Sequence, residues 1–175
     1  MTAAFLAAVW IGASVTSTTG PTSEPGIHLP VPVIKQARER CGPAALEMVL
    51  RFYGADTAAI REAASAYDPG LRGSLITDLA AAARRAGYGA TVAALVPDSL
   101  IALLDAGVPP IVLYQSGRRP VTVGHFAVIT GWDAERATFV LNDGGAEPRR
   151  LGREDLARRW RKAGSQALVV SRRSP

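Results

Sequence analysis

Cysteine is almost missing from this chain, in which Cys41 is the only one among 175 residues. A single cysteine cannot close an intramolecular disulfide, so the hydrophobic core alone has to hold the fold. One cysteine and two histidines, none at the spacing of metal ligands, also cannot build a typical zinc site. No glycine-rich loop stands between a strand and a helix as phosphate-binding loops do. We therefore expect neither a metal nor a cofactor.

Aromatic residues are scarce as well, at 6% of the chain, and only two of the 20 basic residues are lysine. Proteins that bind nucleic acids usually gather basic side chains in a stripe and interleave them with aromatic ones. Here the arginines are scattered along the chain, which is typical of solvated faces. A net charge of +5 is compatible with acidic partners. We expect no nucleic-acid partner.

The chain lacks an apolar run of about 20 residues, the length that a transmembrane helix needs. The apolar stretch at 3–15 is shorter, and a polar stretch follows at 17–26. This pattern is that of an export signal without its basic start, because no Lys or Arg precedes Lys35. We predict an export segment and linker at 1–26, a mature domain at 27–175 with no stable membrane span, and a periplasmic or extracellular location. A cytoplasmic location stays open.

What remains is typical of one folded domain, with 48% hydrophobic residues. Apolar residues recur at helical or strand spacing between turns rich in Gly, Pro and Asp. These patterns predict an extended segment at 29–34, a loop at 115–120, helices at 41–54, 57–67, 74–86, 98–106 and 153–161, and strands at 89–95, 110–114, 125–132, 138–141 and 166–170. Helices come first and an antiparallel sheet follows, so we predict an α+β fold with N-terminal helices packed on the sheet.

Cys41 is the strongest candidate for a functional residue, because it stands at the start of the first predicted helix. A helix N-terminus and a nearby imidazolium both lower the pKa of a thiol, which leaves it as the nucleophilic thiolate. Gly42 removes side-chain bulk beside it and would let a substrate carbonyl approach. Taken alone, a buried structural cysteine explains Cys41 equally well.

His125 and Asp143 complete a set that suits nucleophilic catalysis. His125 opens the predicted strand at 125–132, and Asp143 follows the strand at 138–141. If these strands pair, their ends meet, and Asp143 can accept a hydrogen bond from the imidazole and fix its tautomer. A strand histidine and an aspartate that ends a hairpin are also common structural residues.

Gln36, five residues before Cys41, is the candidate for an oxyanion site. Its side-chain amide could donate to a developing oxyanion beside the backbone N–H of Cys41. By spacing alone, a plain surface glutamine explains this residue better.

Several segments together resemble the peptidase C39 family, in particular its stand-alone bacterial branch. They are VPVIKQ at 31–36, CGPAAL at 41–46, GHFAVITGWD at 124–133 and LND at 141–143. The similarity spans about 29–170 of the chain. It implies a papain-like cysteine peptidase fold, with Cys41 as nucleophile, His125 as general base and then acid, Asp143 as orienter and Gln36 as oxyanion donor.

On this resemblance we predict a bacterial thiol protease, a monomer that hydrolyses a peptide or protein substrate through an acyl-enzyme. We expect cleavage at Gly-Gly or other small-residue sites, because recognition of Gly-Gly is typical of the family. A thiol-dependent amidase or acyltransferase on a non-peptide amide is the nearest alternative, and it would pass the acyl group to an amine. The second alternative is a catalytically silent binding module with the same fold. The presence of all four candidate residues, Gln36, Cys41, His125 and Asp143, argues against it.

Overall fold

The computed structural model describes residues 26–37, 39–118 and 121–172. The predicted export segment at 1–26 lies outside these residues except for Gly26. The helices are α1 (Cys41–Phe52), α2 (Thr57–Ala64), α3 (Ile76–Arg85), α4 (Pro97–Asp105) and α5 (Arg153–Arg161). The strands are β1 (Ile27–His28), β2 (Gly89–Ala94), β3 (Ile111–Arg118), β4 (Val121–Asp133), β5 (Thr138–Asn142), β6 (Arg149–Gly152) and β7 (Gln166–Ser171).

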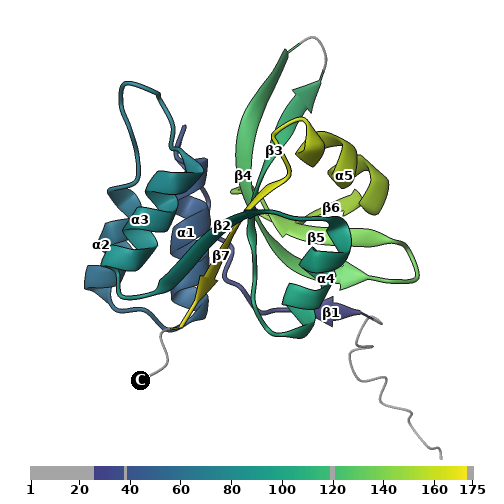
Figure 1. Ribbon diagram of the computed structural model, residues 1–175, viewed down its shortest axis with the longest axis horizontal. Helices are drawn as coiled ribbons and strands as arrows, with labels where there is room; N and C mark the ends of the chain where they lie inside the picture. The colour runs from purple at the N-terminus through teal and green to yellow at the C-terminus, as the bar shows by residue number, and fades with distance from the viewer. Residues whose placement is uncertain (1–25, 38, 119–120, 173–175) are drawn as a thin grey trace, which may run out of the picture.

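All strand pairs are antiparallel, in the order β2-β7-β3-β4-β5-β6, and β1 adds to β4. Figure 1 shows α1, α2 and α3 together on one side of the sheet, and α4 and α5 on the other. This mixed architecture confirms the predicted α+β class. Strands far apart in the sequence are neighbours in the sheet. Strand β2, which precedes α4, pairs with the C-terminal β7.

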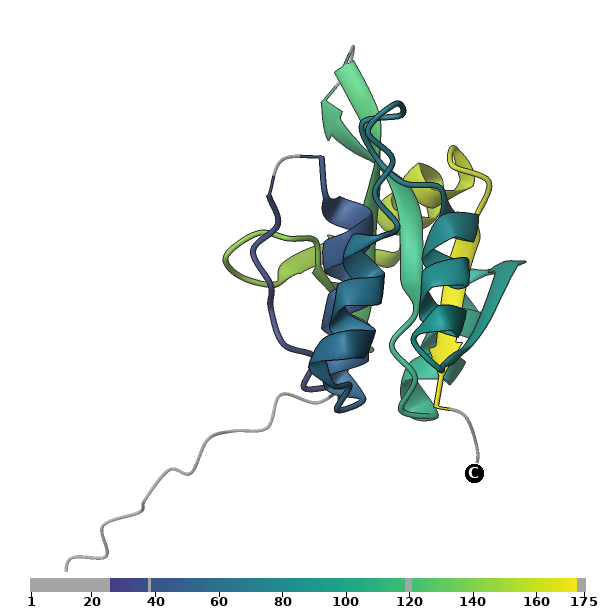
Figure 2. The ribbon, with the colours of Figure 1, turned by 90° about the vertical axis from the view of Figure 1, so that its left-hand side faces the viewer.

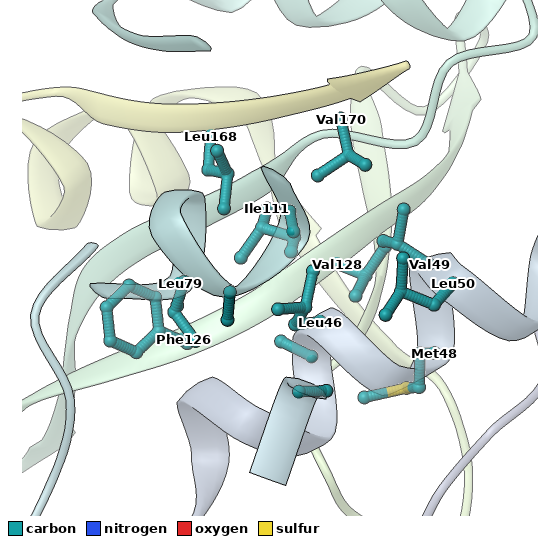
Figure 3. Close-up of a cluster of buried hydrophobic side chains, with 14 of the residues drawn as sticks. Leu46, Met48, Val49, Leu50, Leu79, Ile111, Phe126, Val128, Leu168 and Val170 are labelled. Carbon is teal, nitrogen blue, oxygen red and sulfur yellow. The ribbon is translucent and has the colours of Figure 1, made fainter. Parts of the chain in front are cut away.

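The two sides of the sheet have separate cores because strand residues point alternately to opposite faces. Along β3, Ile111 packs with the side of α1 and Val112 with the side of α4. Along β4, Val128 and Ile129 divide in the same way. Figure 3 shows the first core, in which α1 and α3 contribute Leu46, Met48, Val49, Leu50 and Leu79, and the sheet contributes Ile111, Phe126, Val128, Leu168 and Val170.

Helix α1 is largely buried, and its two ends carry common sequence signals of helix ends. Pro43 lies in the first turn, where its missing N–H has no helical partner to lose. Gly54 ends the helical segment with a φ of +78°, a conformation that glycine adopts without strain. Ala45, Leu46, Val49 and Leu50 are fully buried. The burial fixes the helix, and with it the position of Cys41 at its first residue.

A core substitution in α1 tests this packing. We expect Leu46→Ala to lower the free energy of unfolding by about 2–5 kcal/mol, because it leaves a cavity in a close-packed site. The matched control is Glu47→Ala on the same helix, which removes only an exposed ion pair with Arg51 and should cost about 0.5 kcal/mol or less. Denaturant titration measures both values. Equal losses would show that Leu46 is not part of the core.

Several element bounds differ from the sequence predictions. The predicted second helix at 57–67 stops at Ala64, where the Ser65 hydroxyl donates to the Glu62 carbonyl. The predicted helix at 98–106 begins at Pro97, and Asp98 pairs with Arg153 and does not cap the helix. Strand β6 was missed, because its sequence RRLG lacks the alternation that marks a strand.

The largest difference concerns the loop predicted at 115–120. Residues 115–118 continue β3 and pair with 121–124 of β4, so the two strands form a long hairpin arm. His125 therefore lies inside β4 and does not open a strand. Figures 1 and 2 show this arm and the loop between α2 and α3 projecting from the same end of the molecule, toward which the N-terminus of α1 points.

Candidate active site

Cys41 is the first residue of α1, and neighbouring contacts fix the residues that lead into it. Glu39 has a left-handed backbone (φ +63°) and forms an ion pair with Arg72 of the loop between α2 and α3. The Arg40 guanidinium lies 4.3 Å from the centre of the Tyr67 ring, at the start of the same loop. These two contacts thus hold Glu39 and Arg40, the residues that precede Cys41, against the loop between α2 and α3.

The missing side chain of Gly42 makes room for the loop between α2 and α3. We had predicted instead that it makes room for a substrate carbonyl. A Cβ at Gly42 would lie 3.0 Å from both Cβ and Oγ of Ser74 and 3.3 Å from Cδ2 of Leu79. Ser74 thus packs directly against the turn that carries Cys41. The sequence could not identify Ser74, because nothing local relates it to Cys41.

His125 is held by a main-chain carbonyl and faces Cys41. Its Nε2 lies 2.8 Å from the carbonyl oxygen of Asp143. A carbonyl only accepts hydrogen bonds, so Nε2 must carry a proton and donate it. The ring also interacts with the Cys41 thiol, and because Nε2 is occupied by the Asp143 carbonyl, Nδ1 is the nitrogen left to face it. The bond to Asp143 therefore selects the tautomer that a general base at Nδ1 needs.

The electrostatics of the pair favour the thiolate and the imidazolium. Burial by itself raises the pKa of Cys41, but the hydrogen bond and charge of His125 and the backbone N–H groups of Phe126 and Gly42 outweigh it, so the pKa falls below its ordinary value. Burial by itself lowers the pKa of His125, but hydrogen bonds to Cys41 and the Asp143 carbonyl, with the charges of both residues, raise it. Each partner stabilises the charged form of the other.

The carboxylate of Asp143 has other partners than the imidazole. Its Oδ1 accepts from the backbone N–H of Gly145 at 3.3 Å, and its Oδ2 lies 3.5 Å from Nη1 of Arg149 on β6. We expected Asp143 to accept from the imidazole, and the accepting atom is its backbone oxygen. Sequence reasoning missed Arg149 because it missed β6.

Tyr114 is a further neighbour of the imidazole that the sequence did not indicate. It stands opposite His125 in the β3–β4 register and is fully buried. The two ring centres are 5.8 Å apart with an interplanar angle of 79°, an edge-to-face contact. Only the register of the longer hairpin arm shows this contact, which restricts rotation of the His125 ring.

Gln36 lies against the residue that follows Asp143. Its backbone N–H donates to the carbonyl of Gly144 at 3.2 Å, and its side chain occupies the space beside the Gly144 α-carbon. The Oε1 atom of Gln36 is buried and has no hydrogen-bond partner among the described residues. The fold thus brings Cys41, His125 and Asp143 together and places Gln36 next to Asp143.

Among residues 26–37, 39–118 and 121–172, no group of three or more His, Cys, Asp or Glu side chains is arranged to hold a metal ion. Within the same residues, no helix has the length and apolar character needed to cross a bilayer.

One family model matches most of the chain. The model of the Peptidase C39 like family matches residues 28–168. A search of the curated proteins found no match. The fold is similar to the peptidase domain of Streptococcus ComA, a bi-functional ABC transporter involved in quorum sensing, at 20% identity over 82% of this chain and 99% of that chain, with a TM-score of 0.64.

Two other solved structures have the same fold. A double glycine motif protease from an AMS/PCAT transporter, in complex with its leader peptide, is 22% identical over 83% of this chain and 94% of that chain, with a TM-score of 0.64. A Bacillus anthracis protein described as C39-like is 18% identical over 86% of this chain and 99% of that chain, with a TM-score of 0.68. The predicted papain-like fold is thereby confirmed.

Proposed function

The chain belongs to the Peptidase C39 like family, and from this premise we propose that it hydrolyses peptide bonds with Cys41 as its nucleophile. The observation that carries the proposal is an imidazole beside Cys41 that lowers the pKa of this thiol and whose Nε2 is fixed by the Asp143 carbonyl. This arrangement supplies a base, an acid and an orienting group for one thiol.

The proposed reaction uses these residues in sequence. The Cys41 thiolate attacks the peptide carbonyl carbon, and the carbonyl oxygen becomes an oxyanion that accepts from the Cys41 backbone N–H and the Gln36 amide. The C–N bond breaks as the His125 imidazolium transfers its Nδ1 proton to the leaving amine, which leaves a thioester on Cys41. His125 then takes a proton from water, the resulting hydroxide displaces the thiolate, and a carboxylic acid is released.

A peptide is the substrate class that the surroundings of Cys41 fit best. Leu75 follows Ser74, which contacts the turn of Cys41, and Val123 lies two residues before His125. Both side chains are exposed, as is Leu71 on the same loop, and they offer apolar contacts to an extended chain. The transporter protease with similar fold was crystallised with a leader peptide, and a Gly-Gly or other small-residue cleavage site is our proposal for this chain.

Mass spectrometry of peptide cleavage tests the proposed function. We would incubate the protein, with and without an added amine, with peptides that contain Gly-Gly and with matched peptides in which Val-Val replaces it. Because Cys41 is the only cysteine, protein treated with iodoacetamide is a selective negative control. The proposal requires hydrolysis products that the treated protein does not form. Absence of cleavage, or cleavage that survives alkylation, would overturn it, and amine adducts in place of acids would favour the acyltransferase.

A conservative change at Asp143 separates its backbone from its carboxylate. Because the backbone oxygen accepts from His125, Asp143→Asn should keep kcat/KM within about 10-fold of wild type, whereas a triad that needs the carboxylate loses about 10⁴-fold. The remaining loss reflects the missing negative charge near the imidazolium. A loss near the larger value would show that the carboxylate itself orients the imidazole.

A further inference from the structure

Three consecutive residues, of which the first ends β5, contact two parts of the site. Asn142 donates from Nδ2 to the Val31 carbonyl at 3.1 Å. The carbonyl of Asp143 accepts from His125 at 2.8 Å, and the carbonyl of Gly144 accepts from the Gln36 backbone N–H at 3.2 Å. Both the segment that carries Gln36 and the imidazole are therefore attached to one short stretch of chain.

Gly144 is the one residue of this stretch that must lack a side chain. Its φ is +83°, which proline cannot adopt and other residues adopt only with strain. A Cβ there would lie 2.5 Å from Cδ and 2.6 Å from Cγ and Oε1 of Gln36, closer than real Cβ atoms approach. The Gln36 amide thus packs directly against the backbone of Gly144, in the space that a side chain would fill.

The Oε1 side of the Gln36 amide is positioned by packing and not by a hydrogen bond. Oε1 of Gln36 is buried without a hydrogen-bond partner among the described residues, so no donor there holds it in place. The contact with Gly144 includes the amide carbon and Oε1 themselves, and not only the flexible stem. A methyl group at this position would therefore displace the amide group.

We propose that Gly144 is a positioning residue that sets the place of the Gln36 amide relative to His125. The inference rests on the proposed function, in which Gln36 donates to the oxyanion. Because Asp143 holds the imidazole and Gly144 holds Gln36, two adjacent residues fix the distance between the general base and the oxyanion donor. Gly144 acts through Gln36 and does not touch the substrate.

Gly144→Ala tests this role through hydrolysis and alkylation. We expect kcat/KM to fall about 10²–10³-fold, as when an oxyanion donor is lost, and Gln36→Ala to show a similar loss. The double variant should lose no more than either single one, because both changes remove the same contact. The pH dependence of Cys41 alkylation should stay that of wild type, because alkylation needs no oxyanion donor. Full activity of Gly144→Ala, or multiplied losses in the double variant, would overturn the proposal.

Gly145→Ala is the matched control at the neighbouring glycine. A Cβ at Gly145 would have its nearest neighbours, Oδ1 of Asp143 and the Glu147 carbonyl oxygen, at 3.3 and 3.5 Å, and this residue is exposed. We expect its kcat/KM to stay within about two-fold of wild type. A loss equal to that of Gly144→Ala would show that any side chain in this loop disturbs the site, which contradicts a specific role of Gly144.

An NMR measurement separates this proposal from the proposed function. The side-chain NH₂ resonances of Gln36 are assigned by their absence in Gln36→Ala, and they should shift in Gly144→Ala and stay in place in Gly145→Ala. Unchanged resonances in Gly144→Ala would overturn the positioning role whether or not the wild type cleaves peptides. If Gly144→Ala is poorly folded, the double variant with Gln36→Ala should regain part of the lost thermal stability, since the clash is gone. No regain would contradict the proposed contact.

Discussion

Replacing Cys41 with serine is expected to lower kcat/KM for peptide hydrolysis by about 10⁴-fold or more. Serine has nearly the same size, but its hydroxyl stays protonated where the thiol ionises. In the wild type, hydrogen bonds from His125 and from the backbone of Phe126 lower the pKa of Cys41 despite its burial. They cannot make an alkoxide from serine to a comparable extent, so the nucleophile is lost.

The serine variant also has to be folded for this result to count. Cys41 is only partly buried, and the main packing of α1 comes from Leu46, Val49 and Leu50. We therefore expect the far-UV circular dichroism and the melting temperature of Cys41→Ser to match those of wild type. A folded serine variant that keeps more than about a tenth of the activity would exclude Cys41 as the nucleophile.

His125→Ala is expected to lower kcat/KM by about 10³–10⁴-fold, because it removes both the group that stabilises the thiolate and the acid that protonates the leaving amine. Steady-state hydrolysis of the same peptide measures the loss. The change also empties the space between Tyr114 and Cys41, since the imidazole contacts both.

Added imidazole provides the control for this variant. A soluble imidazole can enter the emptied space and transfer the same protons, so it should restore part of the activity of His125→Ala. It should restore none to Cys41→Ser, in which the nucleophile itself is missing. A His125→Ala variant with near wild-type activity would show that another group serves as the base.

The fold could be predicted where local signals are strong. Pro43 and Gly54 mark the ends of α1, and α5 has the predicted bounds 153–161 because acidic residues begin it and basic residues end it. The hairpin arm was missed because Gly117 and Pro120 are also typical of loops. Pairing with the opposite strand keeps the arm extended, and that pairing is a long-range property.

The site could be predicted to the level of residue types but not of atoms. The positions of Cys41 before a helix and of Asp143 after a strand indicated which residues would meet. The choice of the Asp143 carbonyl over its carboxylate depends on Arg149 and Gly145, which draw the carboxylate away. The role of Gly144 depends on its φ and on the approach of Gln36, and neither is a local property of the sequence.

The most direct test of the account is the rate of Cys41 alkylation by iodoacetamide as a function of pH, in the wild type and in His125→Ala. The rate follows the thiolate fraction, and the structure lowers the pKa of Cys41 through His125. We predict a wild-type midpoint well below that of a free thiol, and a midpoint that moves up when His125 is removed. A wild-type midpoint near pH ~8.5 that does not change in His125→Ala would contradict the thiolate–imidazolium pair.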